Sequence, residues 1–170
     1  MAERGSLPAD IFTDEQLSAE RADLIAGALA ALGVSARIRI LPTRRSASDL
    51  QWLILVALPL QAFLTGIGGK IADDAYKEFQ VAVRKLLRRE HTVQQSAAQP
   101  MVLQDMDSGL QIVLDHDLPA AGYQELLSLD LSRFRLGPLH YDRAQQRWRS
   151  ELDEAAAPPN QAPPETQSGS

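Results

Sequence analysis

The sequence predicts an α+β fold in which a mainly antiparallel sheet of about five strands carries its helices on one face. Three observations support this prediction. Residues 34–41 alternate between apolar and polar side chains, as a half-buried strand does. Residues 70–89 repeat apolar side chains with helical spacing. Two later segments, 101–115 and 136–152, each have the pattern of two short strands around a turn.

The composition fits one folded domain with flexible ends. The chain has 170 residues, of which 45% are hydrophobic and 23% are charged, as in ordinary soluble proteins. We expect a mobile arm over residues 1–12, a single α+β domain over 13–153 and a disordered Pro-rich tail over 154–170. The abundance of Ala, Leu and Arg indicates a bacterial source.

Charge and cysteine content argue against several classes of function. The 17 basic and 22 acidic residues give a net charge of −5, and general binding of nucleic acid needs a surplus of Lys and Arg. The absence of Cys removes disulfides, thiolate catalysis, zinc–thiolate sites and iron–sulfur clusters. Residues 1–12 contain no apolar segment of the kind found in signal peptides. We therefore expect a cytoplasmic protein.

The first two elements follow from their periodicity and their ends. A helix is expected after Thr13, because Asp14 and Glu15 suit a first helical turn and Gly33 suits a helix end. A half-buried strand then covers residues 34–41. Its apolar face consists of Val34, Ala36, Ile38 and Ile40.

The next segment, residues 50–69, has two interpretations. Its 20 uncharged positions reach the length of about 18–20 apolar residues that spans a membrane. It could be a membrane-inserted helix, with the basic helix 70–89 lying on the lipid surface. Alternatively it is a core helix from about residue 48 to Thr65. We favour the core helix, because Pro59 interrupts the apolar run and Gln and Thr side chains form a polar stripe along it.

The remaining elements extend the sheet. The order of elements contains a β-α-β-β-α-β succession, which is the arrangement of a ferredoxin-like core. The N-terminal helix and the C-terminal hairpin are additions to that core. The expected elements after the helix 70–89 are strands 101–105 and 110–115, helix 119–129, and strands 136–141 and 147–152.

Two motif fragments lack the residues that their chemistry requires. Residues 66–70 resemble a phosphate-binding loop, but that loop needs Gly where the chain has Leu64 and Ser or Thr where it has Ile71. Residues 105–109 resemble the start of a calcium loop, but His116 stands where a bidentate Glu should be. We therefore predict a helix break and a hairpin turn, and no cofactor or metal.

Asp115, His116 and Asp117 are the best candidates for a catalytic site. They place an imidazole between two carboxylates, which suits metal binding or acid–base catalysis. The other histidines, His91 and His140, are distant in the sequence. We favour the exposed end of a strand here, and a small enzyme acting through this segment remains an alternative.

The most usable surfaces are two basic clusters, one around the strand 34–41 and one at the end of the helix 70–89. Basic side chains gathered in this way can bind an acidic partner or a phosphate, although for the first cluster we favour a solvated face paired with nearby acids. We predict a non-enzymatic interaction or regulatory module that binds another protein, without assigning an oligomeric state. A membrane-associated effector or regulator is the alternative. The candidate interaction residues are Arg37, Arg39, Arg44, Arg45, Arg84, Lys85, Arg88 and Arg89.

Overall fold

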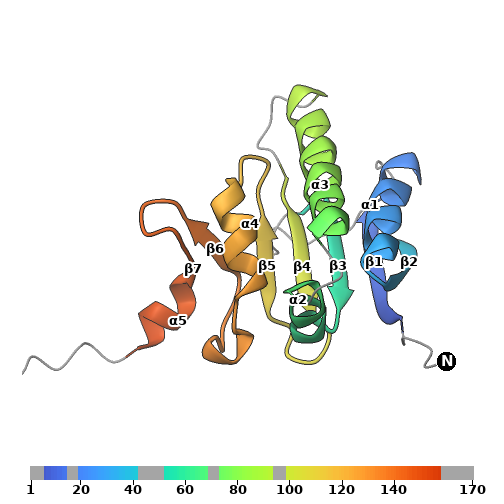
Figure 1. The fold of residues 1–170 in the computed structure, drawn as a ribbon. Helices are drawn as coiled ribbons and strands as arrows, with labels where there is room; N and C mark the ends of the chain where they lie inside the picture. The colour runs from blue at the N-terminus through green and yellow to red at the C-terminus, as the bar shows by residue number, and fades with distance from the viewer. Residues whose placement is uncertain (1–5, 15–18, 42–51, 69–72, 94–98, 158–170) are drawn as a thin grey trace, which may run out of the picture.

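The computed structural model describes residues 6–14, 19–41, 52–68, 73–93 and 99–157. Within these ranges seven strands form one sheet, with helices beside it (Figure 1). The strands are β1 (Leu7–Asp14), β2 (Val34–Leu41), β3 (Ile54–Leu58), β4 (Met101–Asp105), β5 (Gln111–Leu114), β6 (Leu139–Asp142) and β7 (Arg147–Ser150). The helices are α1 (Ala19–Ala31), α2 (Leu60–Gly68), α3 (Asp73–Val93), α4 (Ala120–Leu127) and α5 (Glu151–Ala156), with a short 3-10 helix, η1 (Leu131–Arg133).

The sheet is built from three pairs of neighbouring parallel strands. These pairs are β1 and β2, β3 and β4, and β5 and β6, and helices connect the strands within each pair. Antiparallel pairing joins the pairs to one another and to β7, which gives the order β2-β1-β3-β4-β5-β6-β7. The sheet is therefore mixed, and the prediction of a mainly antiparallel sheet of about five strands is wrong. The order also differs from a ferredoxin-like core, because each helical crossover joins adjacent strands.

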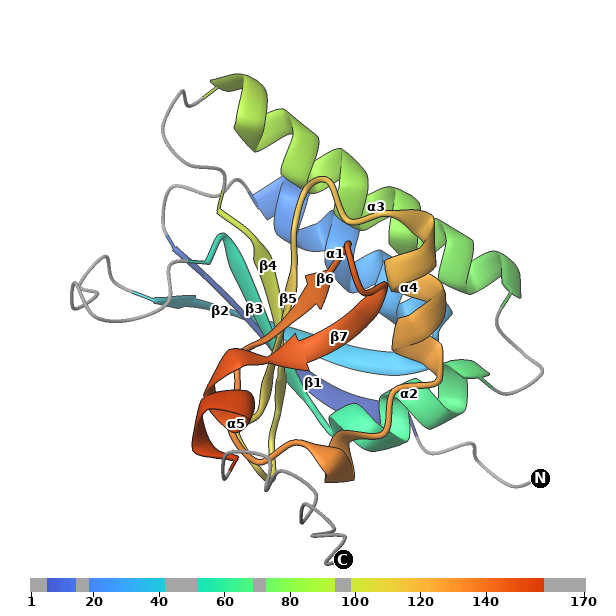
Figure 2. The same cartoon turned by 90° about the vertical axis from the view of Figure 1, so that its left-hand side faces the viewer.

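The two faces of the sheet bury different side chains. Ile54, Val56 and Leu58 of β3 belong to the main core, which also contains the buried residues of α1, α2, α3 and α4. Their neighbours Leu55 and Ala57 belong to a smaller apolar cluster on the opposite face. Figure 2 shows that α1, α2, α3 and α4 lie on one side of the strands. Helices thus cover one face of this sheet.

In the uncharged stretch 50–69, the described residues 52–68 contain a strand and a short helix, so the predicted long helix is wrong. β3 is buried along its whole length, and Pro59 separates it from α2. Because both faces of β3 are covered, its side chains show no alternation, and such a strand resembles a buried helix in sequence. Among the described helices, none has the length and apolar character needed to cross a membrane.

Residues 7–12 lie in the sheet, whereas the sequence analysis assigned them to a mobile arm. β1 runs between β2 and β3, and its Ala9 and Ile11 are buried in the main core. Pro8 and Asp10 made this strand hard to recognise, since both residue types are depleted in strands. The helix expected after Thr13 is α1, which begins at Ala19.

Several local predictions are confirmed. β2 covers the alternating segment 34–41, β4 and β5 form a hairpin, and β6 and β7 form the last one. Gly109, in the turn before β5, has a φ of 74°, a conformation that glycine adopts without steric cost. The last strand ends earlier than predicted, because α5 begins at Glu151 and includes residues 154–156 of the expected tail. Residues 158–170 of that tail lie outside the described residues.

Two hydrogen bonds fasten α4 to its neighbours, and a ring contact joins the two strands beside it. The Tyr76 hydroxyl on α3 donates to the carbonyl oxygen of Tyr123 over 2.5 Å. Nε1 of Trp148 on β7 donates to the carbonyl oxygen of Gly122 over 3.1 Å. The indole also packs edge-on against Tyr141, with the ring centroids 5.6 Å apart. These contacts fix β7 beside α4 and hold the chain that follows α4 close to the sheet.

Candidate interaction surfaces

β2 ends the sheet on one side and exposes apolar side chains. Among the described residues it pairs with β1 alone. Its first residue, Val34, is buried, but Ile38 and Ile40 are 40% and 64% exposed. An edge strand also presents a row of backbone N–H and C=O groups that no strand satisfies. This edge therefore offers both hydrogen-bonding groups and apolar surface to an extended chain.

The face of β2 that points away from the helices carries Arg37 and Arg39. The register sets Arg37 beside Asp10 of β1, and Nε of Arg39 donates to Oδ1 of Asp10 over 2.9 Å. A groove of about 430 Å³ lies here, bordered by both arginines, Asp10 and Met106. Because one carboxylate stands among two guanidinium groups, the groove is basic.

The predicted basic residues form two surfaces on opposite faces of the sheet. Arg37 and Arg39 lie on the face without the four helices, while the second cluster lies on α3 within the helical layer. Arg44 and Arg45 lie outside the described residues, and of Arg89 only its place in α3 is described. The fold therefore does not combine these charges into a single patch.

The basic end of α3 is partly engaged within the molecule. Arg84 lies over the ring of Tyr123, with its guanidinium carbon 5.3 Å from the ring centroid. Burial raises the pKa of Tyr123 to about 12, although the charge of Arg84 acts to lower it. Lys85 and Arg88 are exposed and border a hollow of about 460 Å³ together with Val81.

The segment Asp115-His116-Asp117 follows β5, and folding brings His140 and Arg143 close to it. Arg143 forms an ion pair with Asp117 and donates to its carbonyl oxygen over 3.0 Å. Desolvation raises the pKa of Asp115, and the charge of His140 opposes this effect. Within the described ranges, no three His, Cys, Asp or Glu side chains are grouped so that they could hold a metal ion. The carboxylate of Asp117, which a catalytic pair with Asp115 would use, is therefore already bound to Arg143.

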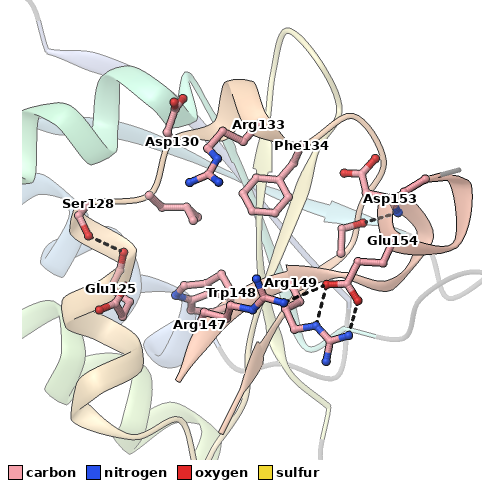
Figure 3. Close-up of a pocket in the computed structure, with 13 residues that line it drawn as sticks. Glu125, Ser128, Asp130, Arg133, Phe134, Arg147, Trp148, Arg149, Asp153 and Glu154 are labelled. Carbon is pink, nitrogen blue, oxygen red and sulfur yellow. Dashed lines mark hydrogen bonds and ion pairs between the residues drawn. The ribbon is translucent and has the colours of Figure 1, made fainter. Parts of the chain in front are cut away.

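A pocket of about 380 Å³ lies where α4, η1, β7 and α5 meet (Figure 3). Its apolar lining consists of Leu129, Phe134, Trp148 and Ala157. Figure 3 shows Arg133 and Phe134 on one side of the pocket and Arg147 and Trp148 on the other. The charged side chains that line it are Glu125, Asp130, Arg133, Arg147, Arg149, Asp153 and Glu154.

Sequence reasoning did not find the exposed edge or this pocket. Ile38 and Ile40 belong to the face of β2 that the alternation predicts to be buried, and the sequence of a strand does not reveal whether it lies at an edge. Phe134 lies between η1 and β6, in a segment without periodicity. The bulk of Phe134 and Trp148 in an aliphatic chain was the only available signal.

Comparison with known proteins found no matching family model, no matching curated protein and no matching solved structure.

Proposed function

We propose that the protein is a non-enzymatic interaction module that binds an extended segment of another protein along β2. The supporting observation is the edge of β2, which combines exposed Ile38 and Ile40 with a free strand edge among the described residues. A peptide that joins such an edge gains main-chain hydrogen bonds, and alternate side chains provide specificity. β2 has eight residues, so it offers a longer template than an average strand.

The two faces of β2 favour different side chains in the added strand. On the helix-bearing side, Ile38 and Ile40 favour apolar residues, because contact would remove their exposed surface from water. On the opposite side, Arg37 has no ion pair with another described residue, whereas Arg39 forms an ion pair with Asp10. Carboxylates placed opposite these arginines would form charge-assisted hydrogen bonds. The partner segment is therefore expected to alternate acidic and apolar residues.

A second copy of the chain fits this edge less well than an acidic segment. If two β2 strands paired antiparallel with their apolar faces on the same side, Arg37 and Arg39 of one copy would stand opposite the same arginines of the other. Directly opposed like charges destabilise a pair of strands. Charge complementarity therefore favours a different, acidic partner.

The proposal can be tested with a capped eight-residue peptide of alternating Glu and Val. NMR titration of the isotope-labelled full chain should show saturable shifts concentrated in the amides of residues 34–41. A peptide of alternating Lys and Val is the matched control, and it should bind at least about tenfold more weakly because it repels the arginines. Equal binding of the two peptides would refute the electrostatic argument.

Two variants separate the β2 surface from a general effect of charge. Arg37→Glu should weaken binding of the acidic peptide at least about tenfold. Arg135→Glu makes the same change of charge at an exposed position between η1 and β6, and should leave binding unchanged. Shifts centred on α3, or equal effects of the two substitutions, would show that β2 is not the binding surface.

A further inference from the structure

Two carboxylates in the pocket between α4 and α5 are already engaged by the chain itself. Asp153 accepts the backbone N–H groups of residues 135 and 136, over 2.9 and 3.1 Å. Asp130 accepts the backbone N–H of Ser132 over 3.0 Å and its hydroxyl as well. These hydrogen bonds fix the loop around η1 and the start of α5. They also direct two negative charges toward the protein rather than toward a ligand.

The three guanidinium groups of the pocket differ in how far they are satisfied. Arg149 forms ion pairs with both Asp142 and Glu154. Nε of Arg147 donates to Oε1 of Gln145 over 2.7 Å, and one of its terminal nitrogens lies 3.7 Å from Glu154. Arg133 makes neither a hydrogen bond nor an ion pair with another described side chain, and Asp130 acts on it through charge alone. Considering the described residues alone, the pocket thus keeps one unpaired guanidinium, that of Arg133, and one that is partly engaged, that of Arg147.

Arg133 and Arg147 each lie on the same side of the pocket as an aromatic residue, Phe134 and Trp148 respectively (Figure 3). Trp148 lines the pocket although it is only 5% exposed, and its Nε1 is committed to the carbonyl oxygen of Gly122. The part of the residue that reaches the pocket is therefore not a free hydrogen-bond donor. Phe134 is half-buried and packs against the main core. A volume of about 380 Å³ is within the range of small-molecule sites.

We infer that this pocket binds an organic carboxylate whose body is aromatic or branched and apolar, with Arg133 binding the carboxylate and Phe134 and Trp148 contacting the body. A planar guanidinium binds a carboxylate through two parallel hydrogen bonds, which suits a free Arg133. This site is separate from β2 and does not depend on the strand-binding function.

Trp148 can report the binding directly. The chain contains two Trp, so Trp52→Phe leaves Trp148 as the single Trp, whose emission can be followed apart from that of the three Tyr. Titration of this full-length variant with phenylacetate should give a saturable change in emission. Phenylacetamide, which has the same shape without the charge, should bind at least about tenfold more weakly. Equal responses to the two compounds, or no saturation up to about 5 mM phenylacetate, would overturn the inference.

Substitutions around the pocket test whether Arg133 is the group that binds the carboxylate. Arg133→Gln should weaken phenylacetate binding about tenfold or more, whereas Arg135→Gln, an exposed change outside the pocket, should not. Glu125→Gln should tighten binding, because it removes a like charge from the lining. Unchanged binding in Arg133→Gln would refute the assigned role. Circular dichroism establishes that each variant is folded.

The carboxylate could belong to a free acid or to the end of a peptide. The tripeptide Gly-Gly-Phe presents the same chemistry at a peptide carboxyl terminus, and its amidated form removes the charge. Tighter binding of phenylacetate would identify the free acid, and tighter binding of the tripeptide would identify a peptide terminus. If neither compound binds better than its amide, the site is not a carboxylate site.

Discussion

The two edges of the sheet are built in opposite ways. β2 has eight residues and exposes Ile38 and Ile40, while β7 at the other edge has four residues and keeps Trp148 buried. Proteins protect sheet edges by shortening them, charging them or covering them, because an open edge can pair with another chain. Both edges carry two arginines, but β7 is short and is followed directly by α5. Of the two edges, β2 is therefore the one suited to binding a strand.

The chain after β7 reinforces this difference. Ser150, the last residue of β7, caps α5. Its hydroxyl donates to the carbonyl oxygen of Leu136 and accepts the N–H of Asp153 over 3.2 Å. Arg149 then binds Glu154 of α5 and Asp142 of β6. Side-chain contacts thus fix the β7 edge in one conformation. The exposed apolar edge at β2 is therefore confined to one side of the sheet.

The largest expected effect is a difference in the free energy of unfolding between substitutions at the two edges. Trp148→Ala should lower the free energy of unfolding by about 3–5 kcal/mol, because a buried indole and its hydrogen bond to Gly122 are lost. Ile40→Ala should change it by less than about 0.5 kcal/mol, because that side chain is 64% exposed. Urea denaturation followed by circular dichroism measures both. Comparable losses would contradict the contrast.

A smaller effect is expected at the start of α5. Ser150→Ala removes the hydroxyl that caps the helix and should lower the free energy of unfolding by about 1 kcal/mol. Ser35→Ala, at an exposed position on β2, is the matched control and should have little effect. The difference in urea midpoint between the variants provides the measurement. A loss in Ser35→Ala as large as in Ser150→Ala would show that the two edges are equally ordered.

Acid should weaken the ion pairs at the β7 edge. Hydrogen bonds from Gln145 and Arg149 lower the pKa of Asp142, and those from Arg149 lower the pKa of Glu154. Because both pKa values are lowered on folding, the stabilisation is present above the ordinary values of 3.8 and 4.5 and is lost as the pH falls below them. Arg149→Gln should therefore reduce the difference in unfolding free energy between neutral and acidic solution. An unchanged difference would indicate that these pairs do not contribute.

The smallest effect on stability is expected from a charge on the open edge. Ile40→Lys should leave the free energy of unfolding within about 0.5 kcal/mol of the unmodified chain, because the lysine can remain in solvent. It should nevertheless weaken binding of the Glu–Val peptide, because it removes apolar contact from the edge. Isothermal titration calorimetry beside thermal unfolding separates the two results. Full binding by a stable Ile40→Lys would show that Ile40 does not contact the peptide.

Local patterns were enough to predict several elements correctly. β2 alternates cleanly, α3 repeats its apolar residues with helical spacing, and the β4–β5 hairpin has Asp, Ser and Gly in its turn. In each case the signal lies within the segment itself. β3 and β1 failed for opposite reasons. β3 is apolar on both faces and so lacks a period, while β1 contains Pro8 and Asp10.

The sequence by itself determined which segments pair locally, which face of α3 is apolar, and the lack of cysteine chemistry. Only the tertiary structure decided that Arg37 and the basic residues of α3 lie on opposite faces, that β2 is an edge, and that Phe134 approaches Trp148 across a pocket. The physical reason is the distance along the chain over which each kind of interaction acts. Periodicity and turn chemistry act over a few neighbouring residues, whereas strand order and pocket lining depend on contacts between residues far apart in the chain.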